Sequence, residues 1–102
     1  MGFVPADLRL SVQRGLVGQI SPRLIGTCVE HHDKQIALTF YVAADLTDEE
    51  RDDLTTVGTM VLGDYPDDFT IHEEFVIATV GTPLRTRGDW VLLQRGFLTV
   101  EG

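Results

Sequence analysis

Apolar positions recur with a helical period between residues 46 and 66, and this segment is the centre of the fold that we predict. Wound at 3.6 residues per turn, one side carries Leu54, Val57, Gly58, Val61, Leu62 and Tyr65. The opposite side carries Asp48, Glu49, Asp52, Asp53, Thr56, Met60 and Asp64. Thr47 and Glu50 have the spacing of a capping box, and Pro66 ends the helix. The pattern predicts an amphipathic helix with one face in the core and an acidic face outward.

A first helix is predicted from Pro5 to about Gly18, where Ser21-Pro22 then turns the chain. Its apolar stripe consists of Leu8, Val12 and Leu16. Leu10 and Val17 point the other way, so this helix is apolar on two sides. We expect a later strand or loop to cover the second side, with another molecule as the alternative.

Two segments with a period of two, Leu24–His32 and Gln35–Val42, predict a β-hairpin with Asp33-Lys34 as its turn. A two-residue turn places His32 opposite Gln35 and, further along, Val29 opposite Leu38 and Ile25 opposite Val42. In this register one face holds Ile25, Val29, Ile36, Leu38, Phe40 and Val42, as a hairpin with one buried side requires. The other face holds Gly26, Cys28, Glu30, Ala37, Thr39 and Tyr41, and we expect it to be partly open.

A third strand is predicted over Phe69–Val80, with Phe69, Ile71, Phe75 and Ile77 inward. Glu73-Glu74 interrupts it, and there we expect a bulge or an edge position. Gly81–Asp89 is predicted as a loop, and Trp90–Leu93 as the beginning of a last strand that extends towards Val100. The elements follow the order αββαββ. We therefore expect residues 1–102 to form a single α+β domain, with an antiparallel sheet of three or four strands and two helices on one face.

The net charge of −8 is concentrated in one part of the chain. Residues 45–74 hold eleven acidic side chains and only one basic side chain, Arg51. A surface of this sign repels nucleic acid phosphates and anionic lipid, and it attracts a basic protein. We therefore predict a basic protein partner, no nucleic acid and no membrane. A solvated face that only keeps the protein soluble is the alternative.

The sequence also indicates where the protein acts. No apolar run approaches the roughly 20 residues of a membrane helix, and the first residues do not resemble a secretory signal. Cys28 is the only cysteine, which excludes an internal disulfide and suits a reducing compartment. A cytoplasmic location is expected.

No group of side chains in the sequence indicates catalysis or a cofactor. His31 and His32 are adjacent in a strand and point to opposite faces, so they cannot bind one metal ion together. Glu73 and Glu74 fail as an acid–base pair for the same reason. Cys28 has no base beside it in the predicted sheet, and we expect a small buried thiol. We predict no metal, no cofactor and no enzymatic activity.

Recognition of a protein remains as the function to consider. Met60 stands on the acidic side of the helix, and an apolar side chain ringed by charge is a candidate anchor for a partner. Tyr41, on the open face of the hairpin, is a second candidate. The predicted partner-binding residues are Asp48, Glu49, Asp52, Asp53, Met60, Asp64, Asp67 and Asp68. A weaker basic group near the C-terminus, Arg85, Arg87 and Arg95, either balances the acidic segment or binds an anion.

The chain resembles a family of short acidic bacterial proteins. The resemblance spans about residues 13–75 and rests on Ile20-x-Pro22-x-Leu24, Asp33-Lys34-x-Ile36, Phe40-Tyr41 and Asp64-Tyr65-Pro66. Some members of the family act as immunity proteins beside contact-dependent or polymorphic toxins. The resemblance implies a cytoplasmic inhibitor that neutralises a basic toxin, a nuclease in particular, by covering its active-site surface. It transfers no functional residue, because the matching motifs are structural.

Two other functions compete with this immunity-type inhibitor. The first is a homo-oligomeric structural or regulatory domain, joined through the two-sided first helix or a sheet edge, so that the chain is a monomer or a homodimer. The second is a small-ligand-binding domain or enzyme, with a pocket on the open sheet face near Cys28, Glu30 and Tyr41. Salt-dependent association with a basic protein distinguishes the inhibitor from both.

Overall fold

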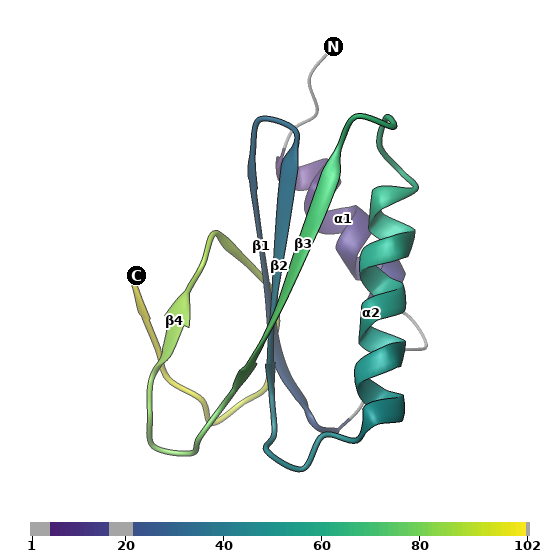
Figure 1. The fold of residues 1–102 in the computed structure, drawn as a ribbon. Helices are drawn as coiled ribbons and strands as arrows, with labels where there is room; N and C mark the ends of the chain where they lie inside the picture. The colour runs from purple at the N-terminus through teal and green to yellow at the C-terminus, as the bar shows by residue number, and fades with distance from the viewer. Residues whose placement is uncertain (1–4, 17–21, 102) are drawn as a thin grey trace.

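The computed structural model describes residues 5–16 and 22–101 (Figure 1). Within them lie two helices, α1 (Pro5–Leu16) and α2 (Asp48–Leu62). The strands are β1 (Leu24–His32), β2 (Gln35–Val42), β3 (Thr70–Ile77), β4 (Leu84–Thr86), β5 (Asp89–Leu93) and β6 (Thr99–Glu101). One sheet has the order β3-β2-β1-β5, and β4 and β6 form a second, two-stranded sheet. Both helices lie on one face of the four-stranded sheet (Figure 1). The predicted α+β class is confirmed.

The main core fills the space between the helices and this sheet. Most of the predicted inward residues of the two helices are buried: Leu8, Val12 and Leu16 of α1, and Leu54, Val57, Gly58 and Val61 of α2. Leu62 and Tyr65, which were also predicted inward, are half-buried, and Tyr65 lies beyond the end of α2. They pack against sheet residues such as Leu38 and Phe40, and each large apolar side chain contributes about 1.5–3 kcal/mol. The expected cover over the second side of α1 is wrong at Leu10. This residue stays 51% exposed, because α2 and the sheet both lie on the side of the Leu8 stripe. Val17 and Gly18 lie outside the described residues.

The β1–β2 hairpin has the predicted register over most of its length. His32 pairs with Gln35 and Val29 with Leu38, and Asp33 adopts the positive φ of 55° at the two-residue turn. The prediction is wrong at Ile25. The register shifts between Leu24 and Gly26, so that Leu24 lies opposite Val42 in place of Ile25. This bulge turns Ile25 to the other face of the sheet, where it is also buried.

The predicted antiparallel sheet is wrong for β3, which pairs with β2 in parallel from Gln35↔Thr70 to Val42↔Ile77. The reason is α2 itself. The helix carries the chain back along the sheet, so β3 starts at the same end as β2, as in other β-α-β crossovers. The pairing is continuous, and β3 is an edge strand. Of the two possibilities at Glu73-Glu74, the edge position is confirmed.

The C-terminal part of the chain covers the second face of the sheet, which was expected to be more open. The predicted loop 81–89 contains β4, and the predicted last strand divides into β5, paired with β1, and β6, paired with β4 in parallel. A second core forms there from Ile25, Cys28, Tyr41 and Leu84, with Val76, Ala78, Trp90 and Phe97 against it. Short strands of three residues carry no periodicity that a sequence pattern can detect.

Candidate functional site

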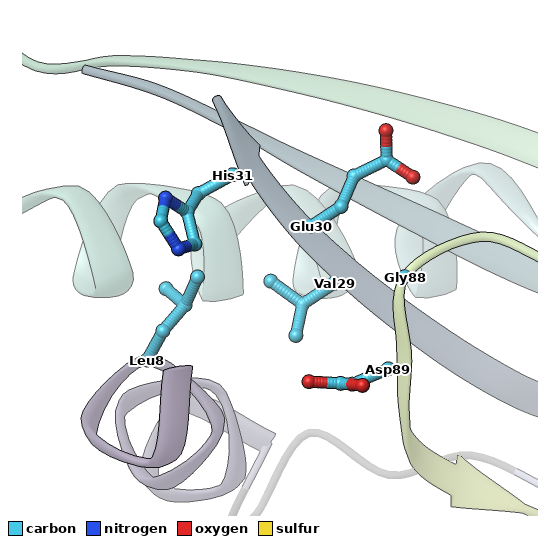
Figure 2. A pocket seen from close by; sticks show the side chains of 6 residues that line it. All are labelled: Leu8, Val29, Glu30, His31, Gly88 and Asp89. Atoms are coloured by element: carbon cyan, nitrogen blue, oxygen red, sulfur yellow. The ribbon is translucent and has the colours of Figure 1, made fainter. Parts of the chain in front are cut away.

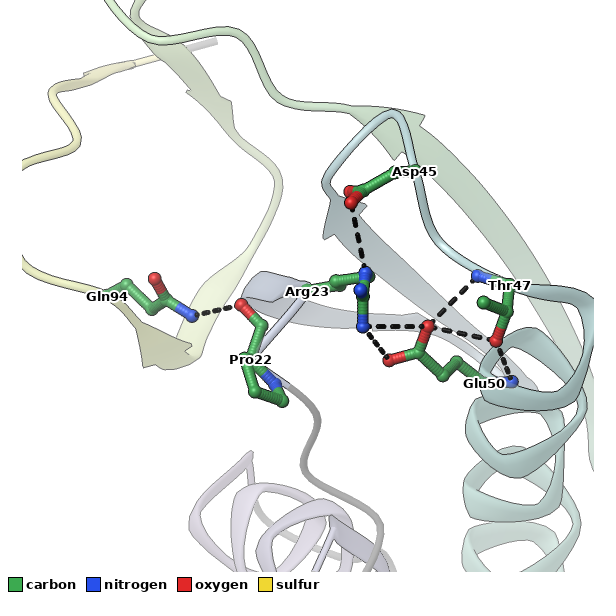
Figure 3. A network of polar contacts seen from close by, with 6 residues as sticks. All are labelled: Pro22, Arg23, Asp45, Thr47, Glu50 and Gln94. Carbon is green, nitrogen blue, oxygen red and sulfur yellow. Dashed lines mark hydrogen bonds and ion pairs between the residues drawn. The ribbon is translucent and has the colours of Figure 1, made fainter.

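The outward face of α2 depends on how the helix is fixed at its N-terminus (Figure 3). Glu50 donates its backbone N–H to Thr47 Oγ1 over 3.1 Å, and Thr47 donates its own to Glu50 Oε1 over 3.0 Å, which confirms the capping box. Arg23 contacts Asp45 Oδ2 at 3.2 Å and Glu50 Oε2 at 3.3 Å. Hydrogen bonds to Asp45, and then to Glu50, raise the pKa of the Arg23 guanidinium. Asp45 and Glu50 are therefore paired within the chain and help to hold the start of α2 in place.

Four carboxylates remain outward on the first two turns of the helix: Asp48, Glu49, Asp52 and Asp53. All four are exposed, and none forms an ion pair with the residues that the structure describes. Met60, about two to three turns further on, is 48% exposed. The structure thus brings together five of the eight predicted partner-binding residues on one helix face.

The other three predicted residues lie near the far end of α2, about 21 Å along a helix of this length. Asp64 accepts a hydrogen bond from the Ser11 hydroxyl and forms an ion pair with Arg14 at 3.2 Å. These two contacts lower the pKa of Asp64. Asp68 pairs with Lys34, which lowers the pKa of Asp68. Asp67 is exposed, with no ion pair among the described residues. Asp64 and Asp68 therefore fix helix and hairpin positions within the chain.

Three contacts form a seam along α2, β3 and the connection between them. The Arg51 guanidinium carbon lies 4.6 Å from the centre of the Phe75 ring, and the Tyr65 ring stacks on Phe69 with 5.2 Å between centres. Between them the Glu73 carboxylate lies against Gly58, where an added Cβ would come within 2.2 Å of Glu73 Oε2. This oxygen is buried and accepts no hydrogen bond from the described residues, and burial raises the pKa of Glu73.

Comparison with protein families shows the family of this chain. The sequence profile of the MafI2 immunity protein matches residues 5–95. The chain belongs to the MafI2 immunity protein family. The match extends beyond residues 13–75, so the C-terminal part of the chain also belongs to the family fold. No curated protein matches the chain.

Membership of the MafI2 family implies a toxin as the binding partner. Among the described residues, no helix has both the length and the apolar character that crossing a membrane requires. Nor do these residues contain a group of three His, Cys, Asp or Glu side chains that could hold a metal ion.

The candidate ligand pocket near Cys28, Glu30 and Tyr41 is wrong for two of these three residues. Cys28 is buried, and the Tyr41 ring lies 5.5 Å from the Trp90 ring in the second core, with its hydroxyl donating to the Arg85 carbonyl oxygen. Burial raises the pKa of both side chains. Tyr41 is only 2% exposed, so it is also wrong as a candidate partner anchor. We predicted a loop and no strand at residues 84–86, and therefore expected the sheet face around Cys28 and Tyr41 to be open.

A shallow pocket does lie at another place, between α1, β1 and the start of β5 (Figure 2). Leu8, Val29, Glu30, His31, Gly88 and Asp89 line it. The His31 ring points towards Leu8 on one side of β1, whereas the Glu30 carboxylate projects on the other side, away from it (Figure 2). These side chains therefore do not converge on a common point.

The basic group near the C-terminus does not act as a unit. Arg87 forms an ion pair with Glu74 of β3 at 2.9 Å. It therefore balances part of the acidic segment, which is one of the two roles that we considered for this group. Arg85 and Arg95 are exposed.

Proposed function

We propose that this MafI2-family chain is an inhibitor that binds a basic toxin domain in the cytoplasm through the outward face of α2. The observation that carries the proposal is the set of four exposed carboxylates, Asp48, Glu49, Asp52 and Asp53, which have no ion-pair partner among the described residues. Met60 supplies an apolar contact beside them. Asp67 extends the surface, and Asp64 and Asp68 add to its negative potential even though each already has a cation beside it.

A nuclease is the class of toxin that fits this charge best. A nuclease active-site surface must attract phosphates, so it carries Lys and Arg. Carboxylates that are held on one helix can occupy the positions of those phosphates and thereby exclude the substrate. Such pairing accelerates association and weakens as salt screens the charges. The inhibitor needs no catalytic step for this function.

A pull-down from the host lysate tests the proposal, with the tagged chain as bait and washes at low and high salt. Recovery of a stoichiometric basic toxin domain, weakened by high salt, is the expected result. The recovered toxin domain is then expressed alone and together with this chain, and co-expression should restore growth. Recovery of only further copies of the chain would support the homo-oligomeric alternative.

Charge reversal then tests the face itself. Asp52→Lys combined with Asp53→Lys changes the net charge from −8 to −4, and so does the control, Glu30→Lys combined with Glu101→Lys. All four positions are exposed. The α2 variant should associate with the toxin domain at least about tenfold more slowly at low salt, whereas the control should change far less. Equal slowing in both variants would show that overall charge, and not this face, determines binding.

A further inference from the structure

Two large apolar side chains are exposed at the end of β3. Ile77 is 61% exposed and Val80, in the turn that follows, is 83% exposed. The sequence placed Ile77 inward with Phe69, Ile71 and Phe75, which do pack against the main core. Ile77 has the same side-chain alternation as these residues, so it faces the helical side of the sheet, but α2 does not reach over it.

Ile77 lies at the end of the sheet from which the chain leads into α2. Arg51 lies over Phe75, and the helix runs in the opposite direction to β3. Ile77 also pairs with Val42, from which a short loop leads to α2. The beginning of α2 and the end of β3 accordingly lie at the same end of the molecule (Figure 1).

Free negative charge is concentrated at this same end. Asp48, Glu49 and Asp52 lie here with no ion pair among the described residues, whereas Asp64, at the other end of α2, is paired with Arg14. This end of the molecule therefore carries exposed apolar side chains on β3 and the turn after it, and unpaired carboxylates on α2. Such a combination fits a partner that presents an apolar pocket bordered by Lys or Arg.

We propose that Ile77 and Val80 form the apolar anchor of the toxin interface, so that the bound toxin domain lies over the N-terminal half of α2 and the end of β3. This inference rests on the proposed function and adds the position and the second element of the interface. A second copy of the chain, pairing along β3, is a poorer occupant. The strand carries His72, Glu73 and Glu74 in its middle, and charges of this kind, with Glu73 inward, oppose edge-to-edge pairing.

The test uses the purified toxin domain that the wild-type chain recovers from lysate. Binding kinetics are measured by surface plasmon resonance for Ile77→Ser combined with Val80→Ser, and for Val80→Ser alone. Val100→Ser is the matched control, because Val100 is a 46% exposed apolar residue on β6. Circular dichroism melts show whether each variant is folded, and Val80→Ser, in an exposed turn, provides the test should the double variant fold poorly.

The double variant should raise Kd about tenfold or more through faster dissociation, and this loss should persist at high salt, where the contribution of charge is screened. The control should bind like the wild type. Wild-type Kd in folded variants, together with slower association of the Asp52→Lys/Asp53→Lys variant, would overturn the anchor and leave the proposed function standing. A wild-type chain that binds no toxin domain would overturn the proposed function itself.

Discussion

Replacing Glu73 with glutamine is expected to stabilise the protein at neutral pH. Glu73 Oε2 is buried in the seam between α2 and β3, and no described group donates a hydrogen bond to it. The carboxylate has therefore lost hydration without gaining a partner, and burial raises the pKa of Glu73 above its ordinary value of 4.5. Glutamine keeps nearly the same shape against Gly58 and removes the charge.

The size of the effect follows from the same contacts. A buried polar group without a hydrogen bond costs on the order of 1–3 kcal/mol, and a charged group costs more. Glu73 as a residue is only partly buried, so solvent screening places the gain near the lower end, at about 1 kcal/mol. In a domain of this size, that gain raises Tm by about 4–8 °C.

The pH dependence gives the sharper test. Because the pKa of Glu73 is higher in the folded state, the folded protein binds this proton more readily than the unfolded chain does. The stability linked to this proton is complete below the ordinary pKa of 4.5 and is lost as the pH rises through the raised folded value. The difference in Tm between Glu73→Gln and wild type should therefore grow from near zero at acid pH to its full size at pH 7. Circular dichroism melts across this range measure it. A variant that melts at or below the wild-type Tm at pH 7, or a difference that does not change with pH, would refute the reasoning.

Two further predictions concern the charged contacts and the thiol. Asp64→Asn removes the negative charge that Ser11 and Arg14 contact and leaves a neutral amide oxygen as the acceptor. Since Asp64 is half exposed, the loss of unfolding free energy at pH 7 should be about 0.5–1 kcal/mol by urea titration. Its pKa is lowered in the folded state, so this stabilisation is present above the ordinary value of 3.8 and should disappear as the pH falls below it. Cys28, buried and with a raised pKa, should react with a thiol reagent such as DTNB only after denaturation. Rapid reaction in the native state would show that the β4–β5 segment opens readily.

The elements with strong local signals were predicted correctly. The Thr47–Glu50 capping box located the start of α2, and the period of two in β1 and β2 gave most of the hairpin register. The bulge at Ile25 was not predictable in the same way, because Leu24 and Ile25 are both apolar and either one can face the core. The sequence also held a signal that was not used. Glu73 shares its strand face with Ile71 and Phe75, and a glycine on the inner side of the helix leaves the room that its carboxylate occupies.

Errors in the remaining predictions come from contacts between residues far apart in the chain. The direction of β3 depends on the β2–α2–β3 crossover as a unit, which a reading of single elements does not test. The ion pairs Arg14–Asp64 and Lys34–Asp68 join residues 50 and 34 positions apart. No local pattern distinguishes these two acidic residues from Asp52 or Asp53, so the predicted binding set included both kinds.

These ion pairs change how the acidic segment should be interpreted. Of its eleven carboxylates, five form ion pairs with residues that the structure describes: Asp45, Glu50, Asp64, Asp68 and Glu74. A partner that engages Asp52 or Asp53 breaks no ion pair with the part of the chain that the structure describes, whereas one that engages Asp64 competes with Arg14. Binding at the N-terminal half of α2 therefore gains charge pairing without loss to the fold. It follows that Asp64→Asn should lower stability while leaving toxin association nearly unchanged. The Asp52→Lys/Asp53→Lys variant should slow toxin association while leaving stability nearly unchanged. Similar effects of the two changes on association would mean that the whole acidic segment, including its paired end, contacts the toxin.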